Sequence, residues 1–253
     1  NTTGGYNTAV GRNALTGNTT ANFNTAVGRA ALFSNTTGHS NTASGYSALR
    51  LNTTASYNTA FGRETLYCNT TGDHNVAVGM QTSYCNCTGT HNTAMGNYAL
   101  HYSCTGSCNT AVGYNALQKN QSGNVNTASG YQALFCNTTG SGNNAMGRAA
   151  MCLNTTGAVN VGIGDFALSN NTTASYNTAV GQKALLATTT GAENTAVGSF
   201  SLYNNTTASY NTAVGKCALK ANTTGSENTA IGRRTLGKTT SGYKNFAGGS
   251  EAL

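Results

Sequence analysis

Proline and tryptophan are absent from this chain, and only 8% of its 253 residues are charged. A soluble domain usually carries about 25% charged residues, so solubility has to rest on asparagine, threonine, serine and, we expect, attached sugar. No stretch approaches the ~20 apolar residues that cross a bilayer, and none has the pattern of a signal peptide. We therefore expect no membrane span in this segment.

Residues suited to catalysis are also few. The six acidic residues and four histidines are dispersed, and no carboxylate pair or Ser-His-Asp arrangement stands out for acid–base or nucleophilic work. The formal net charge is +7, but the basic residues are spread along the chain. We expect no catalytic residue, no cofactor, no metal and no nucleic-acid partner.

What the chain does contain is one 17-residue unit, repeated fifteen times without insertion or deletion. Its landmark, Asn-Thr-Ala-Val-Gly, begins at Asn7 and returns once in every repeat up to Asn245. A fixed short period indicates units that stack on their neighbours rather than fold alone. The sequence predicts one continuous array over residues 1–253. Because the ends fall inside the repeat, we expect an excerpt of a longer repetitive chain.

The repeat predicts an all-β fold. With the landmark asparagine as position 1, position 5 is always Gly, position 9 is nearly always Leu, and positions 12–15 read Asn-Thr-Thr-Gly or Asn-Thr-Thr-Ala. Asn, Thr and Gly are poor helix formers, and a unit of this length is too short for a stable helical hairpin. We predict a parallel β-solenoid (β-roll) of fifteen coils. Thr-Ala-Val forms one strand, Ala-Leu a second, and Thr-Thr is a candidate third.

Each regular position has a physical role in such a stack. The invariant Gly at position 5 suits a corner with positive φ or a crowded backbone. Stacked asparagines at positions 1 and 12 suit side-chain ladders. The Leu column, which includes Leu15, Leu32, Leu49, Leu66 and Leu117, is predicted to be buried. Two apolar side chains in each coil make a thin core, so either ladders or packing of several chains, with a trimer as one option, must add stability.

The unit Asn-Thr-Ala-Val-Gly, Ala-Leu, Asn-Thr-Thr-Gly resembles repeats of tail-fibre-like proteins of phages and environmental bacteria. More loosely, Thr8-Ala9-Val10-Gly11 is similar to the shorter Val-Ala-Ile-Gly core of trimeric autotransporter adhesin heads. The resemblance covers the whole chain and implies a β-solenoid, often trimeric, in an extracellular fibre. The 17-residue length departs from the adhesin-head repeat.

Eight cysteines include two pairs in the same column of adjacent coils. Cys68 and Cys85 are one full repeat apart, as are Cys87 and Cys104. Stacked neighbours about 4.8 Å apart are within the Cα range of a disulfide, so these pairs predict covalent staples in an oxidising compartment. A zinc site of Cys85, Cys87, Cys104 and Cys108 is an alternative that lacks Cys-x-x-Cys spacing. His74 and His91 also share a column, where a weak metal site competes with a solvated surface.

Asn-Thr-Thr is also an acceptor pattern for N-linked sugar, which requires an exposed loop. The structural alternative is that Asn-Thr-Thr simply makes a good turn, and exposed threonines are alternative O-linked sites. The candidate asparagines are Asn18, Asn35, Asn52, Asn69, Asn137, Asn154, Asn171, Asn205 and Asn222.

One further motif matches a nucleotide-binding pattern. Residues 232–239 fit the spacing of a phosphate-binding P-loop. A P-loop requires a following helix, whereas here Gly232 and Leu236 occupy the ordinary positions 5 and 9 and another repeat follows. We therefore expect no nucleotide site there.

These observations predict a structural component of an extracellular fibre or filament, at a cell or virion surface, with self-association as its main partnership. Two alternatives stay open. Threonine columns at positions 2, 13 and 14 suit an ice-binding β-solenoid. Tyrosine and arginine at the variable positions suit an adhesin that binds surface glycans.

Overall fold

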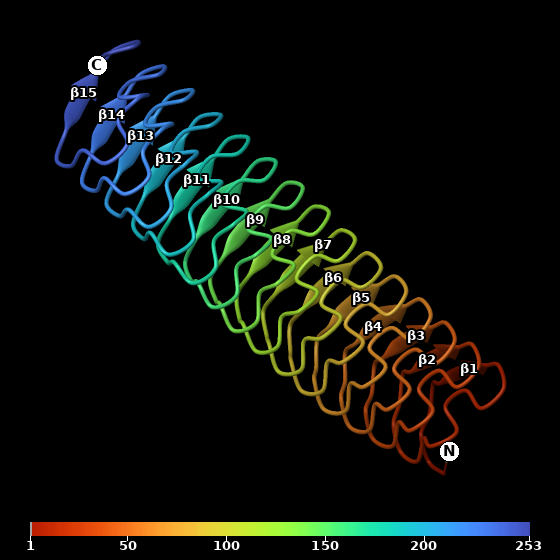
Figure 1. The fold of residues 1–253 in the computed structure, drawn as a ribbon. Helices are drawn as coiled ribbons and strands as arrows, with labels where there is room; N and C mark the ends of the chain where they lie inside the picture. Colours follow the sequence, from red (N-terminus) through yellow and green to blue (C-terminus); the bar gives the residue numbers. More distant parts are fainter. Residues whose placement is uncertain (1) are drawn as a thin grey trace. The chain divides into compact units, whose positions relative to one another are not determined.

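The computed structural model describes residues 2–253 and divides the chain into two units, Asn1–Val125 and Asn126–Leu253. Each unit is a β-solenoid in which one coil corresponds to one repeat and contributes one short strand (Figure 1). No helix occurs among residues 2–253. The all-β, parallel β-solenoid predicted from the repeat is therefore confirmed within each unit.

The strands occupy positions 2–4 of every repeat. In the first unit they are β1 (Thr8–Val10), β2 (Thr25–Val27), β3 (Thr42–Ser44), β4 (Thr59–Phe61), β5 (Val76–Val78), β6 (Thr93–Met95) and β7 (Thr110–Val112). In the second unit they are β8 (Thr127–Ser129), β9 (Asn144–Met146), β10 (Val161–Ile163), β11 (Thr178–Val180), β12 (Thr195–Val197), β13 (Thr212–Val214), β14 (Thr229–Ile231) and β15 (Phe246–Gly248).

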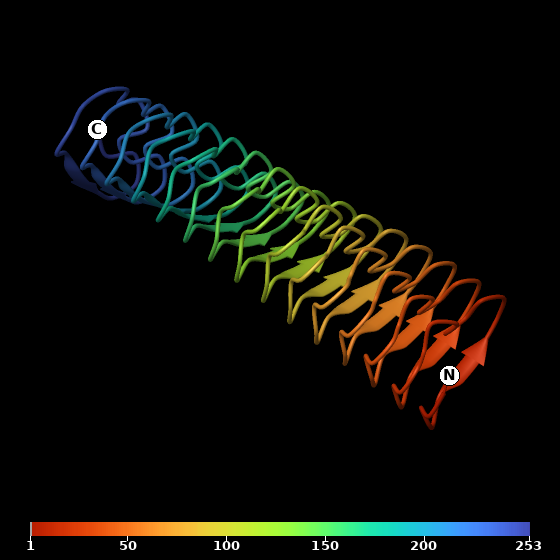
Figure 2. The ribbon, with the colours of Figure 1, turned by 90° about the horizontal axis from the view of Figure 1, so that it is seen from below.

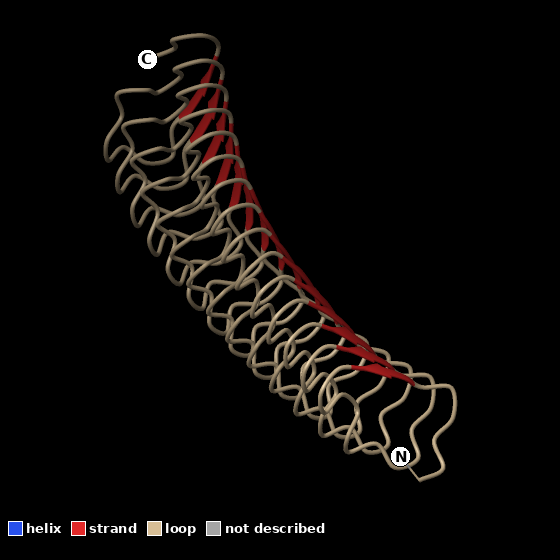
Figure 3. Cartoon of the chain, turned by 90° about the vertical axis from the view of Figure 1, so that its right-hand side faces the viewer, coloured by secondary structure: helices blue, strands red, loops and turns tan. Residues whose placement is uncertain are grey.

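Within each unit the strands pair in parallel with the next strand along the chain, in strict register. Thr8 faces Thr25, for example, and Ala196 faces Ala213. Because the register shift is one full repeat, every position of the unit forms a column of stacked residues. Seen from below or from the side, the strands of a unit lie together on one face of its coils, and turns make up the rest (Figures 2 and 3).

The second and third strands expected in each coil are absent from residues 2–253; that prediction is wrong. The Ala-Leu segment runs through turns in which positions 7 and 9 are left-handed, as at Ala30 (φ 57°) and Leu32 (φ 49°). The Ala30 N–H donates to Arg12 of the preceding coil (2.9 Å), whereas the Leu32 N–H donates to Ala48 of the following coil (3.0 Å). Such a conformation costs roughly 1–2 kcal/mol for each non-glycine residue. The alternating direction of these N–H groups bonds the turn to both neighbours.

The invariant Gly at position 5 forms the predicted corner. In Gly62, φ is 130°, a region that L side chains rarely adopt. A Cβ atom there would also overlap the carbonyl oxygen of Gly79 in the next coil. Both predicted reasons for an invariant glycine, the positive φ and the crowded backbone, therefore apply at this position.

The Leu column is buried, as predicted. Leu117 and the other inner leucines of the column are 0% exposed, and the Ala columns at positions 3 and 8 pack beside them. Leu15 and Leu236, near the ends, are slightly accessible, and Leu253, which no following coil covers, is exposed. One compensating pair stands out. Met151 replaces Leu, and the facing position 3 residue is Gly162, where a Cβ would lie only 3.0 Å from the Met151 side chain. The loss of a methyl group in one coil makes room for the longer side chain in its neighbour.

The asparagines of position 1 form a buried ladder in which each side chain bonds mainly to backbone groups rather than to the next side chain. The Oδ1 atom of Asn58 accepts the backbone N–H of Asn75 in the next coil at 2.9 Å, which confirms that these two residues stack. The Nδ2 atom of Asn75 donates to the carbonyl oxygen of Gly89 at 2.9 Å, across the coil. Each position 1 side chain thus completes the hydrogen bonding of backbone that no strand pairs.

Position 12 forms the amide-to-amide ladder. The Nδ2 atom of Asn52 donates to Oδ1 of Asn35 at 2.7 Å and to the carbonyl oxygen of Ala55 at 2.9 Å. The ladder breaks where the asparagine is replaced. Ser103, Thr188 and Thr239 follow Asn86, Asn171 and Asn222, and the Oδ1 atoms of these three asparagines are buried without a hydrogen-bond partner. Substitution at this position therefore leaves a defect on the preceding coil.

Candidate functional site

The nine predicted glycan acceptors lie inside the coils. They are position 12 asparagines, and each is at most 1% exposed. Their Nδ2 atoms, which would carry the sugar, already donate hydrogen bonds, as the 3.0 Å bond from Asn69 to Gly72 illustrates. The exposed loop that the acceptor pattern requires is not found at these positions. The pattern is explained by the ladder, and the exposed hydroxyls are those of the second threonine, at position 14.

The predicted cysteine pairs stack, but they carry free thiols. The backbone N–H of Cys87 donates to the carbonyl oxygen of Cys104 at 2.9 Å, so these residues are neighbours in one column. All eight cysteines are unbonded in this structure, so the predicted staples are not confirmed. Cys87 Sγ instead lies 3.3 Å from the carbonyl oxygen of Cys85.

Partial burial keeps the thiols of Cys68, Cys85 and Cys87 in the protonated form. Partial burial, followed by a hydrogen bond with Cys104 and the neighbouring thiols, raises the pKa of Cys87 to about 11. Burial also raises the pKa of Cys68 and of Cys85. The thiolate is the nucleophile and the metal ligand, so these groups are protonated at neutral pH.

No metal site forms among residues 2–253: no group of three or more His, Cys, Asp or Glu side chains there could hold an ion. The zinc alternative for Cys85, Cys87, Cys104 and Cys108 is therefore wrong. His74 and His91 do share a column, and their rings stack with centroids 4.9 Å apart at an interplanar angle of 1°. They belong to a π-stack that includes Tyr57.

A longer aromatic stack at position 10 of the first unit was not predicted. Arg50 lies between the rings of Phe33 and Tyr67, at 5.6 Å and 5.7 Å from their centroids. Tyr67 stacks on Tyr84 at 5.1 Å, and Tyr84 on His101 at 5.3 Å. The aromatic residues look scattered in the sequence. Their spacing by whole repeats was the signal that places them in one column.

The basic residues of position 6 do not form a continuous charged surface. Arg148 makes a two-pronged ion pair with Asp165, at 2.9 Å and 2.8 Å. The hydrogen bonds from Arg148 lower the pKa of the Asp165 carboxyl below its usual range. Arg29 lies over the Tyr46 ring at 5.6 Å. These cations are engaged by neighbours in the stack, which is the interrupted stripe that the sequence indicates.

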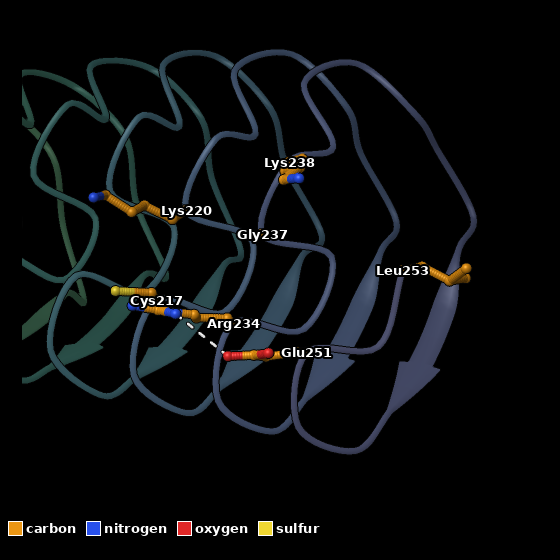
Figure 4. A pocket seen from close by; sticks show the side chains of 7 residues that line it. All are labelled: Cys217, Lys220, Arg234, Gly237, Lys238, Glu251 and Leu253. Atoms are coloured by element: carbon orange, nitrogen blue, oxygen red, sulfur yellow. Dashed lines mark hydrogen bonds and ion pairs between the residues drawn. The ribbon is translucent and has the colours of Figure 1, made fainter.

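A hollow of about 570 Å³ lies beside the P-loop-like segment (Figure 4). Its lining includes Arg234, Lys238 and Glu251, and Arg234 is paired with Glu251 at 3.3 Å. Lys220 extends away from Glu251 and lies 5.7 Å from the centre of the Phe200 ring. No helix follows this segment, because residues 240–253 contain turns and β15 only. The cations do not converge, so the hollow lacks the geometry of a phosphate site.

The sheet face is the most regular outward surface of each unit. We define it as the side chains at positions 2 and 4 of the strands, which point outward while the Ala between them is buried. Position 2 is mostly Thr, and position 4 carries Val, Ile, Met, Phe or Ser, with Gly248 in the last repeat. The exposed apolar residues of position 4 range from 36% at Val78 to 57% at Val10. This face therefore exposes a column of mostly apolar side chains, interrupted at Ser44, Ser129 and Gly248.

Among residues 2–253, no helix is long and apolar enough to span a membrane. Comparison with models of known protein families, with characterised proteins and with solved structures found no match for this chain. The function of the chain is therefore inferred from the geometry of its columns.

Proposed function

We propose that this chain is a structural component of an extracellular fibre, at a cell or virion surface, without enzymatic activity. The β-solenoid fold suits a structural, fibre-like role. The observation that carries the proposal is that almost every regular residue bonds or packs one coil onto the next. Gly makes corners, Ala and Leu fill the core, and the two Asn columns hydrogen-bond along the stack.

Two further features support this assignment. Catalysis requires an irregular constellation of side chains at one place, whereas this repeat distributes each residue type along the stack. The resemblance of the Asn-Thr-Ala-Val-Gly and Asn-Thr-Thr-Gly motifs to tail-fibre-like repeats points to the same role. We expect the natural assembly to contain several copies of the chain, a trimer being one arrangement.

Electron microscopy of native material, combined with fibre diffraction, tests the proposal. We expect thin fibres that contain this chain and give a strong reflection near 4.8 Å, about the distance between stacked strands. A compact monomer that turns over a small molecule would contradict the proposal.

Ice binding is the second candidate, and the in-register threonines of position 2 favour it. The position 13 threonines do not, because their hydroxyls donate to the next coil, as Thr19 does to Thr36 at 3.0 Å. Thermal hysteresis of the purified chain measures this activity directly. Glycan binding is the third candidate. The aromatic stack of the first unit favours it, and a glycan array tests it.

A further inference from the structure

We infer that the sheet face is the seam through which two copies of this chain associate face to face. The inference rests on the proposed fibre, since it names the surface and the partner that build such an assembly. It also stands on three observations of its own: the absence of charge from the face, its exposed apolar column, and its fixed period.

The face is uncharged at every position. Two columns of fifteen residues contain no Asp, Glu, Lys or Arg, although the chain has 19 such residues elsewhere, 13 basic and 6 acidic. Charged residues are the usual means of keeping a protein surface in water and away from other copies. An uncharged face is electrostatically compatible with itself, whereas the Arg-bearing position 6 column would repel a second copy.

The position 4 column of the face is also mostly apolar, with Ser44 interrupting it in the first unit and Ser129 and Gly248 in the second. In β12 and β14, for instance, Val197 is 37% exposed and Ile231 is 48% exposed. Seven strands of three residues give the first unit a face of roughly 34 Å by 10 Å. Threonines of position 2 occupy about half of this face, so its apolar part is a narrow column on a face of about 340 Å².

The period identifies the partner. Side chains of the face recur once per coil, about every 4.8 Å, so only a surface with the same rise keeps its ridges in register over many coils. A second copy has that rise by construction. Two sheets that pack in this way interdigitate their side chains about 10 Å apart. One unit offers less than the ~800 Å² that each partner of a stable pair buries, so we expect association that depends on concentration.

The side chains of position 4 differ in size from coil to coil, and this uneven surface favours a protein partner over ordered water. Ser44 lies beside Phe61 in position 4, and Ser129 beside Met146. A lattice of water requires a flat surface of similar side chains, which these steps interrupt. Apolar side chains of a second copy can repack around such steps, and methionine adapts to them readily.

The test introduces charge at two alternate coils of the face. The seam variant combines Val197→Lys and Ile231→Lys. The matched control combines Thr190→Lys and Thr224→Lys, which adds the same charge at the exposed position 14 with the same spacing. Sedimentation velocity over a range of concentrations measures association, and circular dichroism confirms that each variant is folded. We expect the native chain and the control to associate alike, and the seam variant to associate on the order of 100-fold more weakly.

Each other outcome has a distinct meaning. A seam variant that associates like the native chain places the interface elsewhere and overturns the inference, even if fibres still form. A native chain that is monomeric at all concentrations overturns the inference as well. If that monomer also shows thermal hysteresis, the sheet face binds ice instead of a second copy. Face-dependent dimers without fibres in native material would support the seam and contradict the proposed fibre.

Discussion

The break in the position 12 ladder at Ser103 offers a direct test of how the stack is stabilised. Ser103 is 1% exposed, and neither its hydroxyl nor the Oδ1 atom of Asn86 has a hydrogen-bond partner. Restoring asparagine with Ser103→Asn places an Nδ2 group where Asn52 places its own in an intact part of the ladder. That group can donate to Asn86 and to the carbonyl oxygen of Gly106, in the same turn.

The expected gain follows from these contacts. A buried oxygen left without a partner costs roughly 1–3 kcal/mol, and each new hydrogen bond contributes about 1 kcal/mol. Fixing the longer side chain costs about 1 kcal/mol of rotamer entropy. We therefore expect Ser103→Asn to stabilise the protein by about 2 kcal/mol. This corresponds to a rise in Tm of roughly 4–8 °C for a chain of this size.

The reverse substitution provides the matched control. Asn52→Ser creates in an intact coil the defect that Ser103 already represents, because Oδ1 of Asn35 loses the 2.7 Å bond from Asn52. We expect a loss of similar size. Guanidinium unfolding of both variants measures the effect globally, and hydrogen exchange measures it locally, at the amides of residues 80–110 for Ser103→Asn and of residues 30–60 for Asn52→Ser. If both substitutions are neutral, the buried ladder does not stabilise the stack and the reasoning fails.

Three further predictions concern the core, the corner and the thiols. Leu117→Asp should cost several kcal/mol, because it buries a charge without a partner; an unchanged Tm would mean that the Leu column is not the core. Gly62→Ala should cost on the order of 3 kcal/mol or more, since its Cβ would overlap Gly79 at a φ reserved for glycine; a small effect would show that the corner relaxes. The pKa of Cys87, raised from 9.0 to about 11, means that the folded state holds this proton more tightly than the unfolded chain does. Its contribution to stability is complete below about pH 9 and is lost as the pH rises toward 11, and Cys87→Ser should flatten that part of the pH profile of unfolding. Alkylation of Cys87 that is already fast at pH 8 would contradict the raised pKa.

Much of the fold follows from the period alone. A repeat of constant length without insertion forces each position into a column, and Gly and Leu occupy the columns that a corner and a core demand. The stacking of Asn58 on Asn75, the buried Leu column and the parallel register were all predictable for this reason. The aromatic stack of Phe33, Tyr67 and Tyr84 was predictable too, had the period been applied to the variable positions.

The conformation within one coil was not predictable from composition. The Ala-Leu segment was predicted to be a strand, yet Ala30 and Leu32 both have left-handed backbone conformations. They do so because the turn must direct alternate N–H groups to the coils on either side. The secondary-structure propensity of a short segment does not include the hydrogen bonds that the segment must make to the adjacent coils. The same limit applies to the cysteines, since equal spacing shows that Cys87 and Cys104 are stacked but not how their thiols are oriented.

The asparagines of Asn-Thr-Thr show the division most clearly. The constant period alone places them in one column, but it leaves open whether that column is an exposed acceptor of sugar or a structural turn. The folded coil settles this choice, because burial depends on which side of the coil the turn presents to the interior. Asn52 faces inward, where its amide bonds to Asn35 and Ala55, and a buried amide must be hydrogen-bonded to be stable.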